Sequence, residues 1–273
     1  MGTSSSYKGP GKRPTLIPPW ADDGDTPPPQ DLQPPDEPES TPPIAVPSPN
    51  FWPSLKGLVG KTAAAGLGSG AVSAGKIASG YVRALGGPRN AARAAVTGIP
   101  SGAKLANFLA GAEANGLEAT LASLNLPSLA TDGVEAVMMA LAELLAPPGA
   151  EREDAITRDA ILETLRDWEE MYQNEPDLGL GGPDITQELL TNYLTNYVLE
   201  KASQELGDCL ERRAANTADI HAYYQEFKDG LRSFIELDLS TLDSQTVNWQ
   251  GPEGRAFIQK QLETTYRLLE EQE

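Results

Sequence analysis

The sequence has a single histidine, His221, and a single cysteine, Cys209, among 273 residues. One cysteine cannot form an intrachain disulfide, and one histidine cannot build a histidine-based metal cluster. No run of about 18 uncharged apolar residues occurs, and the first residues carry no apolar signal-peptide core. These absences argue against a disulfide framework, a zinc-finger module and a membrane-spanning helix, and they predict a cytoplasmic protein.

The side chains that catalysis usually requires are also scarce. His221 stands within an aromatic stripe of helical spacing, and Cys209 stands near the end of an amphipathic stretch, so both are expected to be structural. The glycines of residues 179–182 are not followed by the Lys-Ser/Thr pair of a phosphate-binding loop. We therefore expect a protein that is not an enzyme and that holds no cofactor or metal of its own.

Proline is nearly absent from most of the chain, because 15 of the 23 prolines lie at or before Pro53. Residues 1–50 are otherwise rich in Ser, Thr, Asp and Gln and have few apolar residues. Such a stretch cannot bury enough apolar surface to offset the entropy of ordering, so we expect a disordered arm. The folded part is predicted to comprise a basic, Gly- and Ala-rich segment over residues 51–100 and an acidic helical domain over residues 101–273.

The arm itself divides into two parts. Residues 21–50 resemble a spacer stiffened by Pro-Pro pairs and acids, whereas residues 1–20 combine a small polar tip with an apolar cluster that ends in Trp20. A peptide that displays a Trp after two prolines loses little entropy on docking, so we interpret residues 1–20 as a recognition peptide. An unselected, floppy terminus is the alternative. The expected partner-binding residues are Thr3, Ser4, Ser6, Tyr7, Gly9, Pro10, Leu16, Ile17, Pro18, Pro19 and Trp20.

The formal net charge of −18 argues against a general nucleic-acid binder, because phosphate contacts require clustered cations. The charge is unevenly distributed, since residues 51–112 carry seven Lys and Arg and no Asp or Glu. This asymmetry indicates that the basic stretch either packs on the acidic remainder or meets an anionic partner, and we favour the first. Arg89 and Arg93 are the candidates for a basic contact with a partner.

From Ser101 onward, apolar residues recur at helical spacing and no alternating strand pattern competes. We expect Ser101 to cap a helix that ends near Pro127, and Thr131 or Asp132 to cap the next. Further helices are expected from about Asp154 or Thr157, Asp184, Thr217 and Pro252. The predicted fold class is all-α, an irregular helical bundle preceded by the Pro-rich arm.

Three stretches of the sequence resemble a known family. They are Met1-Gly2-Thr3-Ser4-Ser5-Ser6-Tyr7-Lys8-Gly9-Pro10, then Leu16-Ile17-Pro18-Pro19-Trp20 with the following Asp22-Asp23, and Gly86-Gly87-Pro88-Arg89-Asn90-Ala91-Ala92-Arg93. They are similar to the QatB proteins of bacterial Qat anti-phage defence systems. The resemblance implies three partners: the P-loop ATPase QatA, the QueC-like enzyme QatC and the TatD-like nuclease QatD.

The resemblance also implies a role for the arm. QueC-type enzymes use ATP to activate a 7-carboxy-7-deazaguanine and transfer it to an amine. After removal of Met1, Gly2 would present an unhindered amine with a pKa near 7.7–8, so Gly2 is the expected modification acceptor. Two alternatives remain: a scaffold that joins the ATPase and nuclease, or a nucleic-acid or membrane sensor that uses the basic segment.

Overall fold

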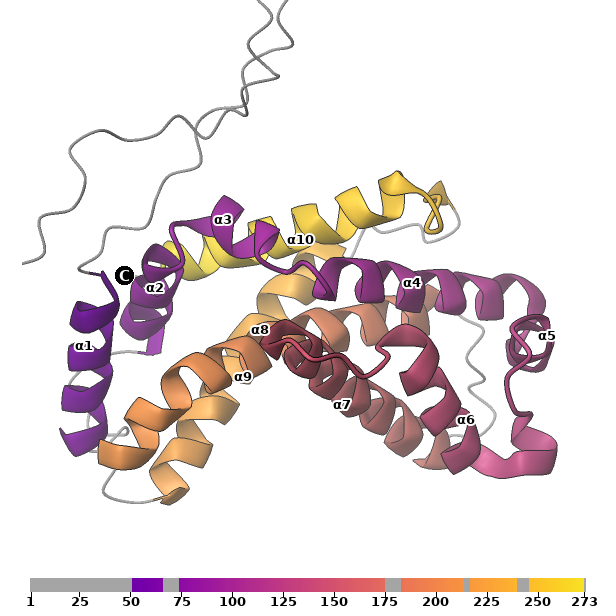
Figure 1. Cartoon of the computed structure of the whole chain (residues 1–273), viewed down its shortest axis with the longest axis horizontal. Coiled ribbons are helices and arrows are strands. Elements are labelled where there is room, and N and C mark those ends of the chain that lie inside the picture. The colour runs from indigo at the N-terminus through magenta and orange to yellow at the C-terminus, as the bar shows by residue number, and fades with distance from the viewer. Residues whose placement is uncertain (1–50, 66–73, 175–182, 214–216, 240–245, 273) are drawn as a thin grey trace, which may run out of the picture. The chain divides into compact units, whose positions relative to one another are not determined.

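The computed structural model describes residues 51–65, 74–174, 183–213, 217–239 and 246–272. The regular elements in these ranges are all α-helices, which confirms the predicted all-α class (Figure 1). In chain order they are α1 (Phe51–Ala65), α2 (Ala74–Ala84), α3 (Pro88–Arg93), α4 (Gly98–Asn115), α5 (Leu117–Ser123), α6 (Leu129–Leu145), α7 (Arg152–Asn174), α8 (Pro183–Arg213), α9 (Thr217–Leu239) and α10 (Pro252–Glu270). The predicted arm, residues 1–50, lies outside the described residues.

Helix α8 is the central element of the bundle. It packs against α7, α9, α1 and α4, and every residue from Leu189 to Val198 is buried. A helix that is buried on all sides must be apolar, or internally satisfied, around its whole circumference. Leucines and tyrosines cover some sides of this stretch, and Thr and Asn cover the others. The Thr191 and Thr195 hydroxyls and the Asn196 side-chain carbonyl oxygen are buried there without a hydrogen-bond partner in the described part of the chain. The other helices are thus arranged around a core that α8 supplies.

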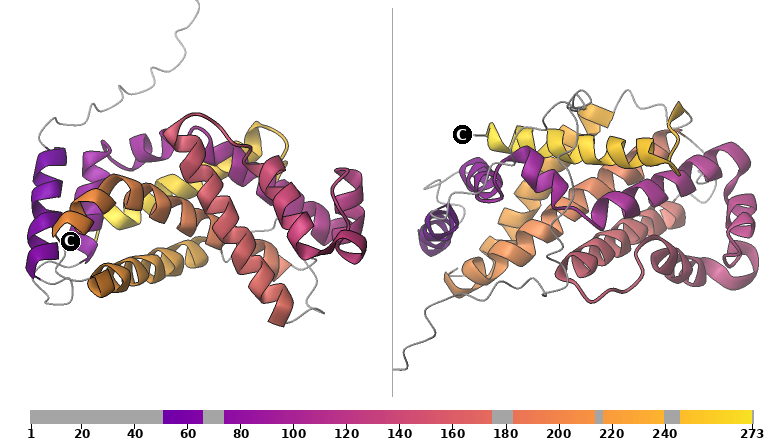
Figure 2. Two further views of the ribbon diagram at one scale, coloured as in Figure 1. Left: turned by 60° about the horizontal axis from the view of Figure 1, so that its bottom comes forward. Right: turned by 45° about the horizontal axis from the view of Figure 1, so that its top comes forward.

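The basic, glycine-rich segment folds as α1, α2 and α3. Glycine-rich helices of this length are unstable alone, so tertiary contacts must hold them. Those contacts exist: α1 packs on α8 and α2, while α2 and α3 pack on α10 (Figure 2). Leu55 and Val59 of α1 and Ile77 and Tyr81 of α2 are buried. The segment thus packs on the helical body, mainly through apolar side chains.

Two helix starts differ from the sequence-based expectation. Helix α4 begins at Gly98, and Ser101 is a buried residue inside it rather than its cap. The apolar pattern after Ser101 continues past Gly116, but the backbone there has a φ of 84°, which separates α4 from α5. The next cap is Ser128, whose hydroxyl accepts a hydrogen bond from the Ala130 amide. Ser128 occupies the position expected for Thr131 or Asp132.

A further cap lies at the start of α7. The Asp154 carboxylate accepts a hydrogen bond from the Glu151 backbone amide, so this acid does support the helix start. Thr157, the alternative cap, is buried farther along the helix, where its hydroxyl is 2.9 Å from that of Thr97. Helices α8, α9 and α10 include the starts that Asp184, Thr217 and Pro252 predict.

The backbone of α4 lies unusually close to two tyrosine side chains of α8, and this contact fixes the two helices relative to each other. An added Cβ at Gly98 would lie 2.5 Å from a ring carbon of Tyr197, and one at Gly102 would lie 2.7 Å from a ring carbon of Tyr193. The Tyr193 hydroxyl also donates a 2.6 Å hydrogen bond to the Gly98 carbonyl. The two glycines are four residues apart and therefore share one face of α4. This glycine face allows two tyrosine rings to lie against the α4 backbone.

We expect Gly102→Ala to lower the free energy of unfolding by about 1 to 3 kcal/mol, because the new methyl group has no room beside the Tyr193 ring. Gly230→Ala is the matched control, since nothing lies within 4 Å of a Cβ at this position in α9. It should raise the free energy of unfolding by about 0.5 to 1 kcal/mol through helix propensity. Urea denaturation of both variants measures the difference, and equal effects would contradict the close approach.

Candidate functional site

The site residues expected from the sequence fall into two groups. Gly2 and the recognition peptide up to Trp20 lie outside the described residues. Arg89 and Arg93 lie on α3, four residues apart and so on the same side of that short helix. Arg89 is exposed and Arg93 is half-buried. The structure therefore places the two candidate cations together on the surface of α3, which packs against α10.

The structure places the two reactive side chains of the sequence, Cys209 and His221, on different helices, α8 and α9. His221 is exposed on α9, and the Cys209 thiol lies 3.2 Å from the backbone carbonyl of Lys56. No group of three or more His, Cys, Asp and Glu residues in the described part could hold a metal ion. Among the same residues, no helix is long and apolar enough to cross a membrane.

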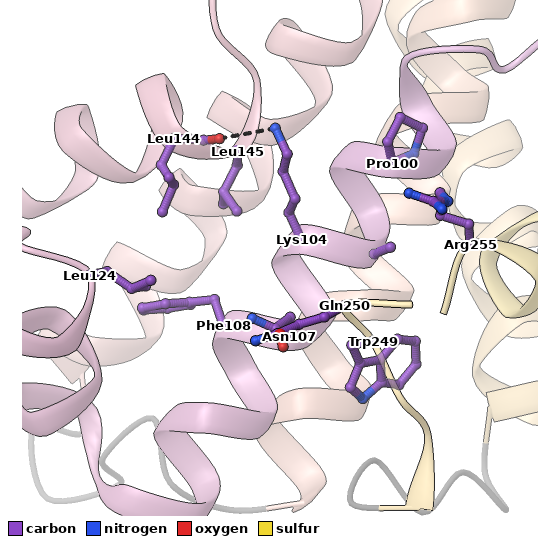
Figure 3. A pocket seen from close by; sticks show the side chains of 11 residues that line it. Pro100, Lys104, Asn107, Phe108, Leu124, Leu144, Leu145, Trp249, Gln250 and Arg255 are labelled. Atoms are coloured by element: carbon purple, nitrogen blue, oxygen red, sulfur yellow. Dashed lines mark hydrogen bonds between the residues drawn. The ribbon is translucent and has the colours of Figure 1, made fainter. Parts of the chain in front are cut away.

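A surface groove of about 350 Å³ lies over the outer face of α4. Figure 3 shows α4 crossing the groove, with Leu144 and Leu145 of α6 on one side and Trp249, Gln250 and Arg255 on the other. Leu124, at the end of α5, also lines it, so four separate parts of the chain build the groove. Its lining residues are Pro100, Ala103, Lys104, Asn107, Phe108, Leu124, Leu144, Leu145, Trp249, Gln250 and Arg255.

Trp249 anchors the wall of the groove next to α10. Its ring packs edge-to-face on Phe257, with the ring centroids 5.3 Å apart. Gly254 makes this packing possible, since an added Cβ there would lie 2.7 Å from the Trp249 backbone. The first turn of α10 therefore closes directly over the Trp249 backbone. The result is a rigid wall built on a helix start.

The groove combines an apolar floor with a basic rim. Leu124 and Leu144 are 36% and 39% exposed, so part of their apolar surface is open at the groove. Lys104 and Arg255 supply two cations, and the Lys104 ammonium donates a 3.3 Å hydrogen bond to the Leu144 carbonyl. None of the lining residues is acidic, although the chain has 39 Asp and Glu residues. The groove is therefore an electropositive, partly apolar surface on an acidic protein.

A second, more polar hollow of about 700 Å³ continues from this groove. The two share Asn107, Phe108, Leu124, Trp249 and Gln250. The second hollow adds hydrogen-bonding side chains, and it also has no acidic lining residue. These polar additions are Asn115, Thr120, Ser123 and Asn248.

A buried polar cluster lies elsewhere in the bundle, between α7 and α8. The Lys201 ammonium is 2.8 Å from the Glu153 carboxylate, which also accepts a hydrogen bond from the Tyr197 hydroxyl. The Lys201 side chain is only 4% exposed, so its charge requires this partner. Burial raises the pKa of Tyr197 above its usual range, and the tyrosine stays neutral. These groups connect α7 to α8.

Glu205 lies at the edge of the same cluster, beside Tyr81 of α2. Burial raises the pKa of the Glu205 carboxyl more than the neighbouring Tyr81 and Lys201 lower it. One of its carboxylate oxygens is buried and has no hydrogen-bond partner. Burial likewise raises the pKa of Tyr81 and Tyr266. Glu205 is thus a carboxylate whose charged form is costly in the folded chain.

Sequence reasoning missed the groove. Trp249 and Gln250 fall in a polar stretch before Pro252 that gave no candidate residue. Lys104 was counted only within the basic stretch of residues 51–112, and Arg255 was not singled out. The one available signal was a large aromatic residue inside an otherwise polar connection, because aromatic residues on loops often mark binding surfaces. That signal does not reveal which helix faces the tryptophan.

Taken together, fold and groove define an α-helical protein with an electropositive, partly apolar surface and with a buried Lys201–Glu153 pair between α7 and α8. A family model described as Qat anti-phage system associated protein QatB matches residues 86–269. Because the match covers more than half of the chain, the protein belongs to the QatB family and is a component of the Qat anti-phage defence system. Neither the curated proteins nor the solved structures contain a match.

The family match begins at the Gly86-Gly87-Pro88 stretch and continues through nearly all of α10. It therefore includes the groove and the buried cluster, together with Arg89 and Arg93. The arm, α1 and α2 lie before it. The likeness of the opening residues to QatB proteins stays a prediction.

We expect Lys201→Ala to lower the free energy of unfolding by about 3 kcal/mol or more, because it leaves the Glu153 carboxylate without its cation. Arg166→Ala is the control, since this arginine forms an exposed pair with Glu163 one turn away. Its loss should be below about 0.5 kcal/mol. Urea denaturation compares the two, and similar losses would show that the Lys201 pair is not buried.

The buried Glu205 carboxyl predicts how the stability of the protein depends on pH. Its pKa is raised in the folded chain, so the folded chain binds this proton more tightly than the unfolded chain does. The contribution of Glu205 to stability therefore falls as the pH rises above its usual pKa of 4.5. Glu205→Gln should raise the free energy of unfolding at neutral pH and change it little at about pH 4.

Urea denaturation at both pH values measures this effect. Glu236→Gln serves as the control, because Glu236 is exposed on α9. A Glu205→Gln variant that gains no stability at neutral pH, relative to this control, would contradict the burial of the carboxylate.

Proposed function

We propose that this protein is the non-enzymatic component of the Qat defence complex, bound by the QueC-like enzyme and modified by it on Gly2. The proposal places the chain in the cytoplasm, where ATP is available to the enzyme. QatA and QatD are the further partners. In this role the helical body docks on other components while the arm enters the active site of the QueC-like enzyme.

The non-enzymatic role is supported by the contacts that ionisable side chains make in the described part of the body. Interhelical pairs occupy several of them, including Lys201 with Glu153, Arg158 with Glu143 and Arg232 with Glu188. Catalysis instead calls for a nucleophile and a base that open together onto a substrate pocket. The groove over α4 offers apolar side chains, amides and two cations, a composition suited to binding a partner.

The opening residues support the second part of the proposal. In the proposed reaction the neutral amine of Gly2 attacks the ATP-activated carboxyl of a 7-carboxy-7-deazaguanine. An amide bond forms, AMP leaves and the amine gives up a proton. The α-amino pKa near 7.7–8 leaves a useful fraction of neutral amine at physiological pH. Thr3 to Trp20 then serve as the recognition peptide, with Trp20 as the apolar anchor.

The second candidate is a scaffold that only joins the ATPase and the nuclease. The groove over α4 supports this role as well as it supports the first, because both roles require a surface that binds a partner. The two candidates differ in what they require of the arm. If the protein is only a scaffold, deletion of residues 2–20 leaves phage defence intact. If the protein is a substrate, the same deletion abolishes defence while the body still binds its partners.

Gly2→Pro tests the acceptor directly. The intact mass of the protein, coexpressed with the QueC-like enzyme, should increase by the mass of one deazaguanine acyl group in the wild type and stay unchanged in Gly2→Pro. The reason is that proline presents a hindered secondary amine in place of the glycine amine. Gly24→Pro makes the same substitution in the spacer and should leave the modification in place.

Trp20→Ala tests the recognition peptide and should reduce the modified fraction without removing the acceptor. An unmodified wild-type N-terminus, or a modification that persists in Gly2→Pro, would disprove the substrate role.

A further inference from the structure

We infer that the groove over α4 is the docking site for a peptide segment of a partner protein that carries acidic residues next to apolar ones. This inference deepens the proposed function, since it rests on the protein working by being bound. It assigns the contact surface on the body and the chemistry of the segment that occupies it.

The first observation concerns the pairing of Arg255 compared with the arginines that follow the start of α4. From Gly98 onward, the other arginines whose side chains are described each have a partner. These are Arg152 with Gln204, Arg158 with Glu143, Arg166 with Glu163, Arg232 with Glu188 and Arg267 with Glu263. Arg255 is exposed, lines the groove and pairs with no acidic residue in the described part of the chain. An unpaired cation at a groove rim is suited to an anionic partner group.

The location of Arg255 on α10 strengthens this point. It is the fourth residue of the helix, close to the end where the helix dipole is positive. Cations are disfavoured there, and a carboxylate held near Arg255 would relieve that cost. Lys104 lies on the same groove and adds a second positive charge. The groove thus gathers two positive charges, and none of its lining residues is an acid that could neutralise them.

The exposure of the apolar side chains that line the groove favours a peptide over a nucleotide as the bound partner. Base stacking requires an open aromatic face, but Trp249 and Phe108 are only 5% and 3% exposed. The apolar surface that remains open comes from Leu124 and Leu144. Leucines of this exposure suit an aliphatic or aromatic side chain of a protein partner.

The adjoining polar hollow completes the fit. Its side-chain amides, from Asn107, Asn115, Asn248 and Gln250, can donate and accept hydrogen bonds. An extended peptide exposes one backbone donor and one acceptor per residue and needs such partners when it is covered. A peptide with its apolar anchor over the leucines and its main chain along these amides uses both hollows. Its carboxylates then reach Lys104 and Arg255.

Site-specific photo-crosslinking tests the docking surface in the intact complex. A photo-reactive phenylalanine analogue replaces Leu144 in the full-length chain, which is coexpressed with the other components of its operon. We expect one dominant crosslink, to a segment of another Qat component with Asp or Glu beside an apolar residue. Leu162 is the control, because it has the same 39% exposure on α7 and does not line the groove.

Charge reversal tests the electrostatic part. Arg255→Glu should lower the amount of copurified partner by about tenfold or more, since a like charge would face the partner carboxylate. Lys260→Glu makes the same change on an exposed cation of the same helix and should have little effect. Changing the crosslinked acid of the partner to Lys should restore copurification with Arg255→Glu. Circular dichroism of each variant checks that the helices are intact.

The outcomes separate this inference from the proposed function. The intact mass of the N-terminus, measured in the same samples, reports on Gly2 independently of the groove. A modified Gly2 with no groove crosslink, or with Arg255→Glu binding as wild type, would overturn the docking site alone. So would a crosslink to a second copy of this chain, or to nucleic acid. An unmodified Gly2 with a groove crosslink would retain the docking site and reject the substrate role.

Discussion

The contact between α4 and α8 is the constraint on which the rest of the fold depends. Tyr193 and Tyr197 lie against the backbone of α4, and glycines at positions 98 and 102 leave the room for their rings. Because α8 is buried around its circumference, helices on its other sides must adapt to where this contact fixes it. The same contact sets the position of α4, whose outer face carries the groove. The buried contact between α4 and α8 thus determines where the groove lies on the surface.

The positive charges of this acidic protein have different surroundings in the basic segment and in the groove. The basic segment packs on the body mostly through apolar residues, with Arg83 lying 3.9 Å from Glu270 as one ionic contact. The groove instead gathers two cations where no lining residue is acidic. Fixed charges of one sign on a concave surface attract the opposite sign from solution. An acidic protein can in this way present a local surface for acidic partners.

Helical periodicity in the sequence was sufficient to predict the class of the fold. The apolar repeats from Leu189 to Val198 and from Ile258 to Leu269 correspond to the buried faces of α8 and α10. Helix starts were predicted less well. Ser101 has the residue type of a cap, but it is buried inside α4. Local cap preferences are worth about 1 kcal/mol, and a buried helix contact outweighs them.

The sequence by itself determined the helical class, the Pro-rich composition of the first 50 residues and the likeness to QatB proteins, because these depend on local composition and order. Only the tertiary structure decided that Lys104, Leu144 and Arg255 share one groove. They come from three helices that are distant along the chain, and periodicity within one helix carries no information about which helix lies beside it. The groove on the body is therefore a product of packing.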